Sequence, residues 1–204
     1  MSSSPAQGAS AMLLLPIEDV RHVARTSSCP EETQAALWTI ANRLHLDEDD
    51  VEILLSRIAT TPEEQVGVLR TALWALTLEP ERLPVERTIE LATRARAETV
   101  RRAAIRALHV APSVLAVEAL RIASREDPVP ANRGEAITFL ATRLPEAEAL
   151  EAAAEALRDE TNPEVRARWL DLARAYGTKE PRAFPGSTGG SRTVPRSDPM
   201  TSIR

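Results

Sequence analysis

The segment NPEVRARWLDLA at residues 162–173 is one of five copies of a motif that recurs along this chain. The other copies are CPEETQAALWTIA from Cys29, TPEEQVGVLRTAL from Thr61, AETVRRAAIRAL from Ala97 and VPANRGEAITFL from Val129. Counted from Pro30, Pro62, Glu98, Pro130 and Pro163, the copies are 32, 36, 32 and 33 residues apart. A motif with a period of this size is typical of a stack of similar helical units.

In every copy, the residues six, seven and ten positions after that starting point are apolar. They are Ala36, Val68, Ala104, Ala136 and Trp169 at the first position, Leu37, Leu69, Ile105, Ile137 and Leu170 at the second, and Ile40, Ala72, Leu108, Leu140 and Ala173 at the third. Residues at this spacing share one face of an α-helix. Each copy therefore predicts a helix that buries one side and forms the first helix of a two-helix unit.

A second apolar stripe follows four of the copies, and the sequence shows no alternation of apolar and polar residues of the kind that strands have. The stripes are Val51, Leu54, Leu55 and Ile58; Ile89 and Ala92; Leu115, Ala119, Leu120, Ile122 and Ala123; and Leu150, Ala153, Ala154 and Leu157. We therefore expect an all-α fold of nine or ten helices in antiparallel pairs. The sequence leaves open whether residues 29–76 stack continuously on residues 97–176.

Two copies carry clear signals for the start of a helix. Thr61 is a good capping residue, Pro62 suits the first helical position, and Glu64 can complete a capping box. We therefore expect a helix to begin at Pro62. Asn162 followed by Pro163 is a second start with a good cap.

Composition and charge limit the class of partner. The chain has 204 residues, of which 3% are aromatic, and a net charge of −5. Residues 177–204 hold five basic and two acidic side chains, a charge of +3, which leaves −8 for residues 1–176. An acidic body argues against nonspecific binding to nucleic acid, because such binding requires a basic surface.

Three segments are expected from composition. Residues 1–15 predict a disordered leader, residues 16–176 the repeat domain, and residues 177–204, rich in proline and glycine, a disordered basic tail. The N-terminus lacks the basic and apolar regions of a signal peptide, and no stretch is long enough to span a membrane. Cys29 is the only cysteine, so no intramolecular disulfide is possible. We expect a cytoplasmic protein.

The Pro-Glu-Val-Arg sequence at 163–166, preceded by Ala-Leu-Arg-Asp-Glu at 156–160, resembles HEAT repeats, in particular the short HEAT-like repeats of the phycobilisome-lyase type. The resemblance covers about residues 30–176. It implies a right-handed α-solenoid of about five HEAT-like helix pairs. In such families the arginine of the motif commonly pairs with an acidic residue of the next loop. The resemblance thus implies a structural role for Arg101, Arg133 and Arg166.

Helical arrays of this kind present extended surfaces that bind partners. We expect the second helices to line the concave face, where mixed charge suits a protein or peptide partner. The candidate partner-binding residues are Arg87, Glu90, Glu118, Arg121, Arg125, Glu151, Glu155 and Arg158. The leading hypothesis is a protein-interaction adaptor or scaffold rather than an enzyme, with the basic tail as a tether or second contact.

Nucleic-acid binding is the first alternative. Five arginines cluster on and before one predicted first helix, at Arg94, Arg96, Arg101, Arg102 and Arg106. Arg102 and Arg106 stand four residues apart and share a helix face. This stretch suits either a phosphate-binding patch or a solvated ridge of salt bridges.

A lyase-like enzyme that acts on a bound cofactor is the second alternative, and few residues support it. His22, His45 and His109 lie in different units, and Cys29 has no histidine near it in the sequence. The acidic run at 47–50 lacks the ligand spacing of a calcium loop and suits the N-terminus of a helix. We expect no metal or cofactor.

The three tryptophans have two interpretations. Trp38, Trp74 and Trp169 lie on predicted first helices, at or next to the apolar face. Core packing is the ordinary role of tryptophan at this spacing, and a peptide-binding aromatic shelf is the alternative. The sequence does not separate the two.

Overall fold

The computed structural model describes residues 12–43 and 45–177, and within them all regular structure is helical. The helices are α2 (Ile17–Thr26), α3 (Pro30–Ala41), α4 (Glu48–Thr60), α5 (Val66–Leu76), the short 3₁₀-helix η1 (Pro80–Arg82), α6 (Val85–Arg94), α7 (Glu98–Val110), α8 (Val114–Glu126), α9 (Pro130–Arg143), α10 (Glu146–Asp159) and α11 (Pro163–Gly177). The all-α prediction is confirmed. Residues 1–11 of the predicted leader and 178–204 of the predicted tail lie outside the described residues. The last four residues of the predicted leader, 12–15, form a turn in which the N–H of Leu15 donates to the Met12 carbonyl.

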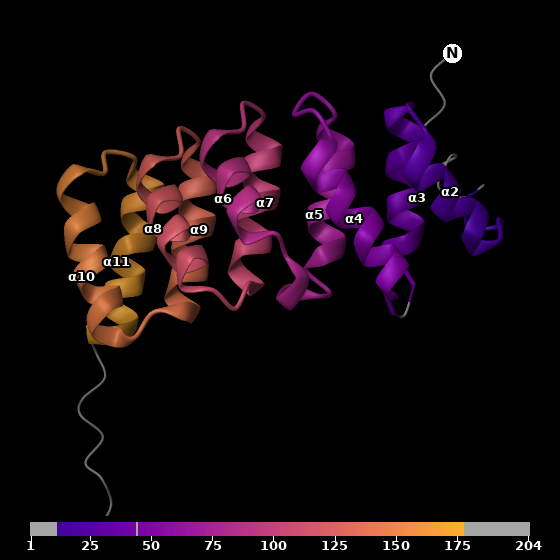
Figure 1. Cartoon of the computed structure of the whole chain (residues 1–204). Coiled ribbons are helices and arrows are strands. Elements are labelled where there is room, and N and C mark those ends of the chain that lie inside the picture. The colour runs from indigo at the N-terminus through magenta and orange to yellow at the C-terminus, as the bar shows by residue number, and fades with distance from the viewer. Residues whose placement is uncertain (1–11, 44, 178–204) are drawn as a thin grey trace, which may run out of the picture.

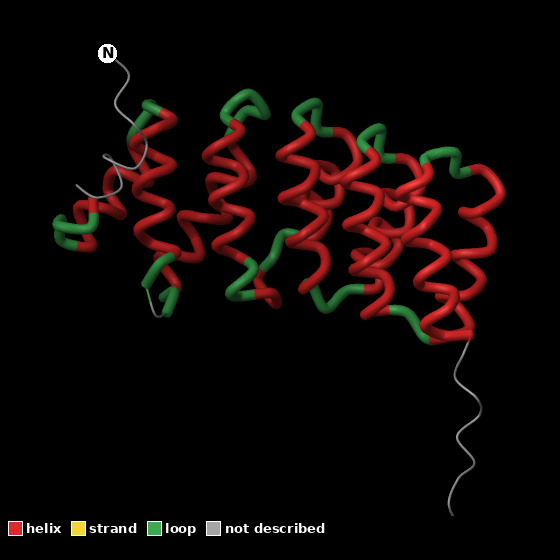
Figure 2. The backbone as a smooth tube through the Cα atoms, turned by 180° about the vertical axis from the view of Figure 1, so that it is seen from behind, coloured by secondary structure: helices red, strands yellow, loops and turns green. Residues whose placement is uncertain are grey.

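The helices stand side by side in one elongated stack (Figure 1), which Figure 2 shows from behind. In one layer, α3, α5, α7, α9 and α11 each pack against the next helix. The other layer holds α2, α4, α6, α8 and α10, where α2 packs on α4 and α6 packs on α8. Because α5 packs on α7, residues 29–76 and 97–176 belong to one continuous stack.

Each motif helix packs more closely on the helix that precedes it in the chain than on the helix that follows. The pairs are α2–α3, α4–α5, α6–α7, α8–α9 and α10–α11, so the predicted units are shifted by one helix. The motif arginines contribute to this pairing, because each donates hydrogen bonds to carbonyls of the connection before its own helix. Arg101 donates to Ala95, Arg133 to Asp127, and Arg166 to Glu160.

The predicted apolar columns form the core, with two exceptions at its end. All of their residues are buried except Leu170, which is 40% exposed, and Ala173, which is partly buried. Both lie on α11, and no described helix follows α11 to cover this side. Trp169, on the same helix, is buried where three of the other copies have alanine.

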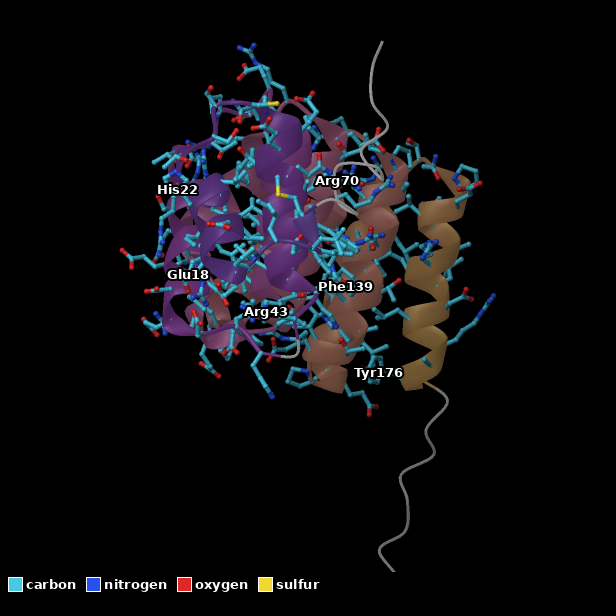
Figure 3. All side chains as sticks on the ribbon, turned by 90° about the vertical axis from the view of Figure 1, so that its right-hand side faces the viewer. Glu18, His22, Arg43, Arg70, Phe139 and Tyr176 are labelled. Carbon is cyan, nitrogen blue, oxygen red and sulfur yellow. The ribbon has the colours of Figure 1, made fainter. Side chains whose placement is uncertain are left out.

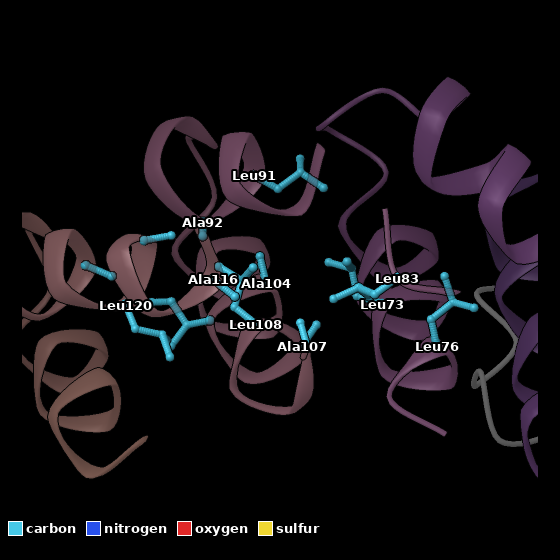
Figure 4. Close-up of a cluster of buried hydrophobic side chains, with 14 of the residues drawn as sticks. Leu73, Leu76, Leu83, Leu91, Ala92, Ala104, Ala107, Leu108, Ala116 and Leu120 are labelled. Carbon is cyan, nitrogen blue, oxygen red and sulfur yellow. The ribbon is translucent and has the colours of Figure 1, made fainter. Parts of the chain in front are cut away.

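Small side chains allow the motif helices to approach each other. Ala72 and Ala104 have no exposed surface, and helices that pack through small residues can sit close together, within the usual range of about 8–10 Å between axes. Figure 4 shows this part of the core, with Leu73 and Leu76 of α5 and Leu108 of α7. The few aromatic residues of the sequence are consistent with a core of alanine and leucine.

The predicted helix start at Pro62 is wrong. α5 begins four residues later, at Val66, and the preceding residue makes no side-chain cap. Residues 62–65 form a turn, in which the N–H of Gln65 donates to the Pro62 carbonyl. The Glu63 carboxylate accepts a hydrogen bond of 3.0 Å from the N–H of Arg96, in the next unit. This long-range contact replaces the local capping that the sequence predicts.

Two other helix starts follow the prediction. The Asn162 side chain accepts hydrogen bonds from two N–H groups in the first turn of α11, at 3.0 and 3.2 Å. Asp47 and Asp50 form a capping box at the start of α4. The guanidinium of Arg21, on α2, also binds both carboxylates. The acidic run at 47–50 thus caps a helix and ties α4 to α2.

Two of the motif arginines pair with a carboxylate of the next connection, as the resemblance implies. Arg101 donates to both oxygens of Asp127, at 2.8 and 3.2 Å, and Arg133 donates to both oxygens of Glu160, at 2.8 and 2.9 Å. Asn132 donates to Asp127 as well. Arg101 and Asp127 are both buried, so their charges are paired away from water.

These contacts lower the pKa of both carboxyl groups. Burial by itself raises the pKa of Asp127, but hydrogen bonds from Arg101, the Val129 N–H and Asn132 outweigh it, and the pKa lies below its ordinary value. Glu160 shows the same balance, in which burial raises the pKa and the hydrogen bond from Arg133 contributes most to lowering it. The unfolded chain therefore takes up protons in acid more readily than the folded chain.

We expect Arg101→Gln to lower the free energy of unfolding by about 3–5 kcal/mol, because the substitution leaves the Asp127 carboxylate buried without its charged partner. Arg125→Gln is the control, since Arg125 pairs with Glu155 at the surface, and its loss should be at most about 1 kcal/mol. Urea denaturation followed by circular dichroism measures both values. Equal, small losses would contradict the structural role of Arg101.

Acid should destabilise the protein through the same groups. The stability that Asp127 and Glu160 contribute is complete above the ordinary carboxyl pKa of about 4 and is lost as the pH falls through their lowered folded-state values. Urea midpoints measured from pH 7 downward should therefore fall less steeply for Asp127→Asn than for the wild type. Parallel curves would show that Asp127 does not titrate with a lowered pKa.

Candidate functional site

A groove of about 420 Å³ crosses α3, α5 and α7. It is lined by Gln34, Trp38, Arg70, Thr71, Trp74, Thr77, Thr99, Arg102, Ala103 and Arg106. None of these described residues is acidic, and none is a histidine or a cysteine. The groove combines aromatic surface with three guanidinium groups.

Two tryptophans form the apolar part of the groove. Trp38 is 38% exposed and Trp74 is 45% exposed, whereas Trp169 is only 1% exposed. Each of the two exposed tryptophans directly follows a buried leucine, Leu37 or Leu73, and therefore stands at the edge of the buried helix face. Large apolar side chains that gather in an exposed concavity mark interaction sites. The aromatic-shelf interpretation thus suits Trp38 and Trp74, and core packing holds for Trp169.

The arginines of the groove differ in how far their charges are neutralised. Arg70, which is labelled in Figure 3, is exposed and makes no ion pair or side-chain hydrogen bond with any described residue. Arg102 donates to Glu98 at 2.8 Å, and Arg106 donates to Glu135 at 2.6 Å. The carboxylates of these two pairs lie outside the groove lining, and Arg70 is the lining arginine that has no carboxylate partner among the described residues.

The structure divides the arginine stretch that predicted nucleic-acid binding. Arg101 is buried in its pair with Asp127 and cannot reach a ligand. Arg94, at the end of α6, and Arg96, in the following connection, are exposed and do not line the groove. Only Arg102 and Arg106 line it.

The candidate residues on the second helices largely neutralise one another. Arg87 pairs with Glu90 at 2.6 Å, Arg121 with Glu148 at 2.7 Å, and Arg125 with Glu155 at 3.1 Å. Glu151 and Arg158 are exposed on α10. These pairs stabilise the surface of their own layer and leave little net charge for a partner.

Four of those candidates come together in a second groove, of about 430 Å³, between α8 and α10. They are Glu118, Arg121, Arg125 and Glu155. Trp169 also lines this groove, and its indole N–H is buried without a partner among the described residues. Both signs of charge line this groove, whereas the charged side chains that line the groove across α3, α5 and α7 are all arginines.

The residues with catalytic potential lie apart. His22 and His45 are exposed, and His109 stacks on Phe139 with 4.2 Å between ring centroids. Burial, with a smaller effect of Arg143, lowers the pKa of His109. In the part of the chain that the structure describes, no three His, Cys, Asp or Glu side chains converge as metal ligands, and no helix is long and apolar enough to cross a bilayer.

Comparisons of the chain with known protein families, with curated proteins and with solved structures find no match. Its function is therefore argued from its own surfaces. Among these, the groove across α3, α5 and α7 is the site where exposed aromatic rings and unneutralised charge coincide.

Sequence analysis did not select Arg70. Arg70 lies 24 residues before the arginine stretch that begins at Arg94, and only the packing of α5 on α7 brings it to the groove with Arg102 and Arg106. In the structure Arg70 stands four residues after the start of α5, as Arg102 does after Glu98.

With the quenching constant of each ion divided by its value for free N-acetyltryptophanamide, we expect iodide to quench the fluorescence of Trp38 and Trp74 more efficiently than caesium, because the arginines of the groove attract anions although the whole chain is acidic. Added salt should reduce the difference between the two ions. The double variant Trp38→Phe/Trp74→Phe, in which Trp169 is the only remaining tryptophan, should be quenched weakly by both. Equal quenching of the wild type by both ions would contradict a positive groove.

Proposed function

We propose that this chain is a cytoplasmic, right-handed HEAT-like α-solenoid that works as a protein-interaction adaptor and binds a protein or peptide segment in the groove across α3, α5 and α7. The observation that carries the proposal is the pair of exposed tryptophans, Trp38 and Trp74, in a concavity with three arginines and no acidic lining residue among those described. Tryptophan and arginine are the side chains most enriched at binding hot spots.

In this proposal the layer of motif helices is the inner side of the curved stack. Each of its helices packs on the next, whereas α4 and α6, and α8 and α10, make few contacts. Helices on the inner side of a bent stack lie closer together than those on the outer side. We therefore place the binding site in the groove across α3, α5 and α7 and not on the second helices, where the sequence analysis expected it.

The composition of the groove supports binding rather than catalysis. Its polar lining residues are threonine, glutamine and arginine, and none of these exchanges protons near neutral pH. General acid–base catalysis relies on groups that do. A lyase-like reaction has no comparable support from the described residues.

Single-stranded nucleic acid is the second candidate for this groove. Bases stack on exposed aromatic rings and phosphates bind arginine, so Trp74 with Arg102 and Arg106 could serve this purpose. The charge of −8 on residues 1–176 opposes it, since nucleic acid brings many negative charges. A short peptide brings fewer.

Site-specific crosslinking can decide between the two layers. A photoreactive phenylalanine analogue replaces Thr99 in the groove or Glu151 on the second-helix layer, both of which are exposed. The tagged full-length protein is crosslinked in its native cells, with and without nuclease, and its partners are identified by mass spectrometry. We expect a discrete protein to crosslink at position 99 and not at position 151.

The same experiment in a Trp38→Ala/Trp74→Ala background should lose at least about nine-tenths of the crosslinked partner, because each hot-spot tryptophan contributes about 2 kcal/mol or more. Val114→Ala, which removes an exposed apolar side chain outside the groove, is the matched control and should leave the yield unchanged. Crosslinking at position 151 alone would reject the groove as the site. Recovery of only nuclease-sensitive material would favour nucleic acid.

A further inference from the structure

Three successive helices repeat the same two lining positions of the groove. α3, α5 and α7 begin at Pro30, Val66 and Glu98. Four residues after these starts stand Gln34, Arg70 and Arg102, and eight residues after them stand Trp38, Trp74 and Arg106. Four residues are about one helical turn, or roughly 6 Å. The six side chains therefore form two rows that cross the three helices.

The dimensions of the rows match an extended peptide. Packed helix axes lie about 8–10 Å apart, so the two rows extend over roughly 16–20 Å. An extended chain advances about 3.3 Å per residue, so about five or six residues cover this length. The two rows are about one turn apart, which is narrower than the diameter of about 10–12 Å of a helix with its side chains. The groove suits an extended segment better than a helix.

The groove ends at α9. Its next pair of positions, four and eight residues after Pro130, is Gly134 and Thr138. The Arg168 guanidinium lies over both, donating to the Gly134 carbonyl at 3.4 Å and to the Thr138 hydroxyl at 3.3 Å. A Cβ at position 134 would lie 2.7 Å from the Arg168 Nε, so the glycine leaves room for this side chain. The site is therefore limited to three helices.

The groove has an apolar end and a cationic end. α3 contributes Trp38 without a cation, α5 contributes Trp74 with Arg70, and α7 contributes Arg102 with Arg106. Arg70 has no ionic partner among the described residues. The pairs of Arg102 and Arg106 with Glu98 and Glu135 are surface pairs worth about 0–1 kcal/mol, so a carboxylate of a partner can replace them.

We infer that the occupant of this groove is an extended acidic segment of about five or six residues, with a large apolar side chain between Trp38 and Trp74 and carboxylates on Arg70 and on the Arg102–Arg106 pair. The two carboxylates stand about two and about four residues from the apolar side chain. Arg70 lies half a helix spacing and one turn, roughly 7–8 Å, from the point midway between Trp38 and Trp74, and α7 lies one and a half spacings, roughly 12–15 Å, from that point. This inference rests on the proposed function and names the chemistry of its partner.

An acidic peptide fits these observations better than nucleic acid does. The α3 end of the groove has no arginine to follow a phosphate backbone. Beyond the groove lies a body with a charge of −8 over residues 1–176, which repels a long polyanion more strongly than a short segment with two or three carboxylates. The same acidic surroundings restrict where a negative segment can bind, which confines it to the groove.

The test pans a displayed library of random eight-residue peptides on the full-length protein, on Arg70→Glu and on Arg158→Glu, and the enriched peptides are also measured on Trp74→Ala. Arg158 is the matched control, because it is also exposed and without an ion pair to any described residue, but lies on α10 outside the groove. Enriched peptides are then synthesised with a fluorescein label, each beside a counterpart with Asn for Asp and Gln for Glu. A labelled single-stranded oligothymidylate of twelve nucleotides is measured in parallel.

We expect the enriched peptides to carry Asp or Glu two to four residues from an aromatic or large aliphatic residue. Their neutral counterparts, and the acidic peptides on Arg70→Glu, should bind at least about tenfold more weakly, whereas Arg158→Glu should stay within about twofold of the wild type. One outcome separates the acidic segment from the proposed adaptor function. Peptides that depend on Trp74 but are neutral or basic would overturn the acidic segment and leave the adaptor groove standing.

Three further outcomes would contradict the acidic segment, the proposed groove, or the choice of a peptide over nucleic acid. If acidic peptides bind Arg70→Glu as well as the wild type, the acidic segment does not occupy this groove and the inference fails. If no enriched peptide loses affinity in Trp74→Ala, both the inference and the proposed groove fail. If the oligothymidylate binds more tightly than every peptide and loses affinity in Arg70→Glu, the groove is a nucleic-acid site instead.

Discussion

The buried contact between Arg101 and Asp127 sets the geometry of the stack from α7 onward. Arg101 belongs to α7, and Asp127 belongs to the connection that leads into α9. Because a buried carboxylate requires its hydrogen bonds to be satisfied, only one position of that connection relative to α7 meets the demand. Arg133 and Glu160 repeat the contact one unit later. The two contacts fix where α9 begins relative to α7 and where α11 begins relative to α9; α3 and α5 have Thr33 and Gln65 at the corresponding motif position and make no such pair among the described residues.

The points at which α3, α5 and α7 begin have a direct consequence for the surface. Side chains at the same distance from successive helix starts fall into rows across the stack, and the rows of the groove contain two tryptophans and three arginines. Rows of this kind need no loop to position them, so their side chains are held on rigid elements. The same regularity limits the groove, because Arg168 occupies the corresponding place on α9. Two neighbouring arginines of α7 therefore have different roles. Arg101 is buried in its pair with Asp127, and Arg102 lines the groove.

The layer of α6, α8 and α10 and the layer of α3, α5 and α7 differ in how their charged side chains are paired. On α6, α8 and α10, arginines and glutamates stand within reach of each other and pair. In the groove, Arg70 has no such neighbour among the described residues, although the chain as a whole is acidic. A local positive site attracts a short acidic segment, and the negative body around that site repels long polyanions. Electrostatics of this kind contributes selectivity, and the two tryptophans contribute the apolar contact area.

The sequence by itself determined the helices and the apolar columns of the core, because each of these depends on spacing within one helix or one repeat. The structural role of Arg101 and Arg133 was implied by the resemblance to HEAT repeats. Only the tertiary structure decided three further points. It placed the start of α5 at Val66, since a contact with the next unit replaces the local cap. It left Trp74 exposed and buried Trp169, because exposure depends on which neighbouring helices cover a given face. It also separated Arg101 from Arg102, since one residue along a helix turns the side chain by about 100° and moves it from the core to the groove.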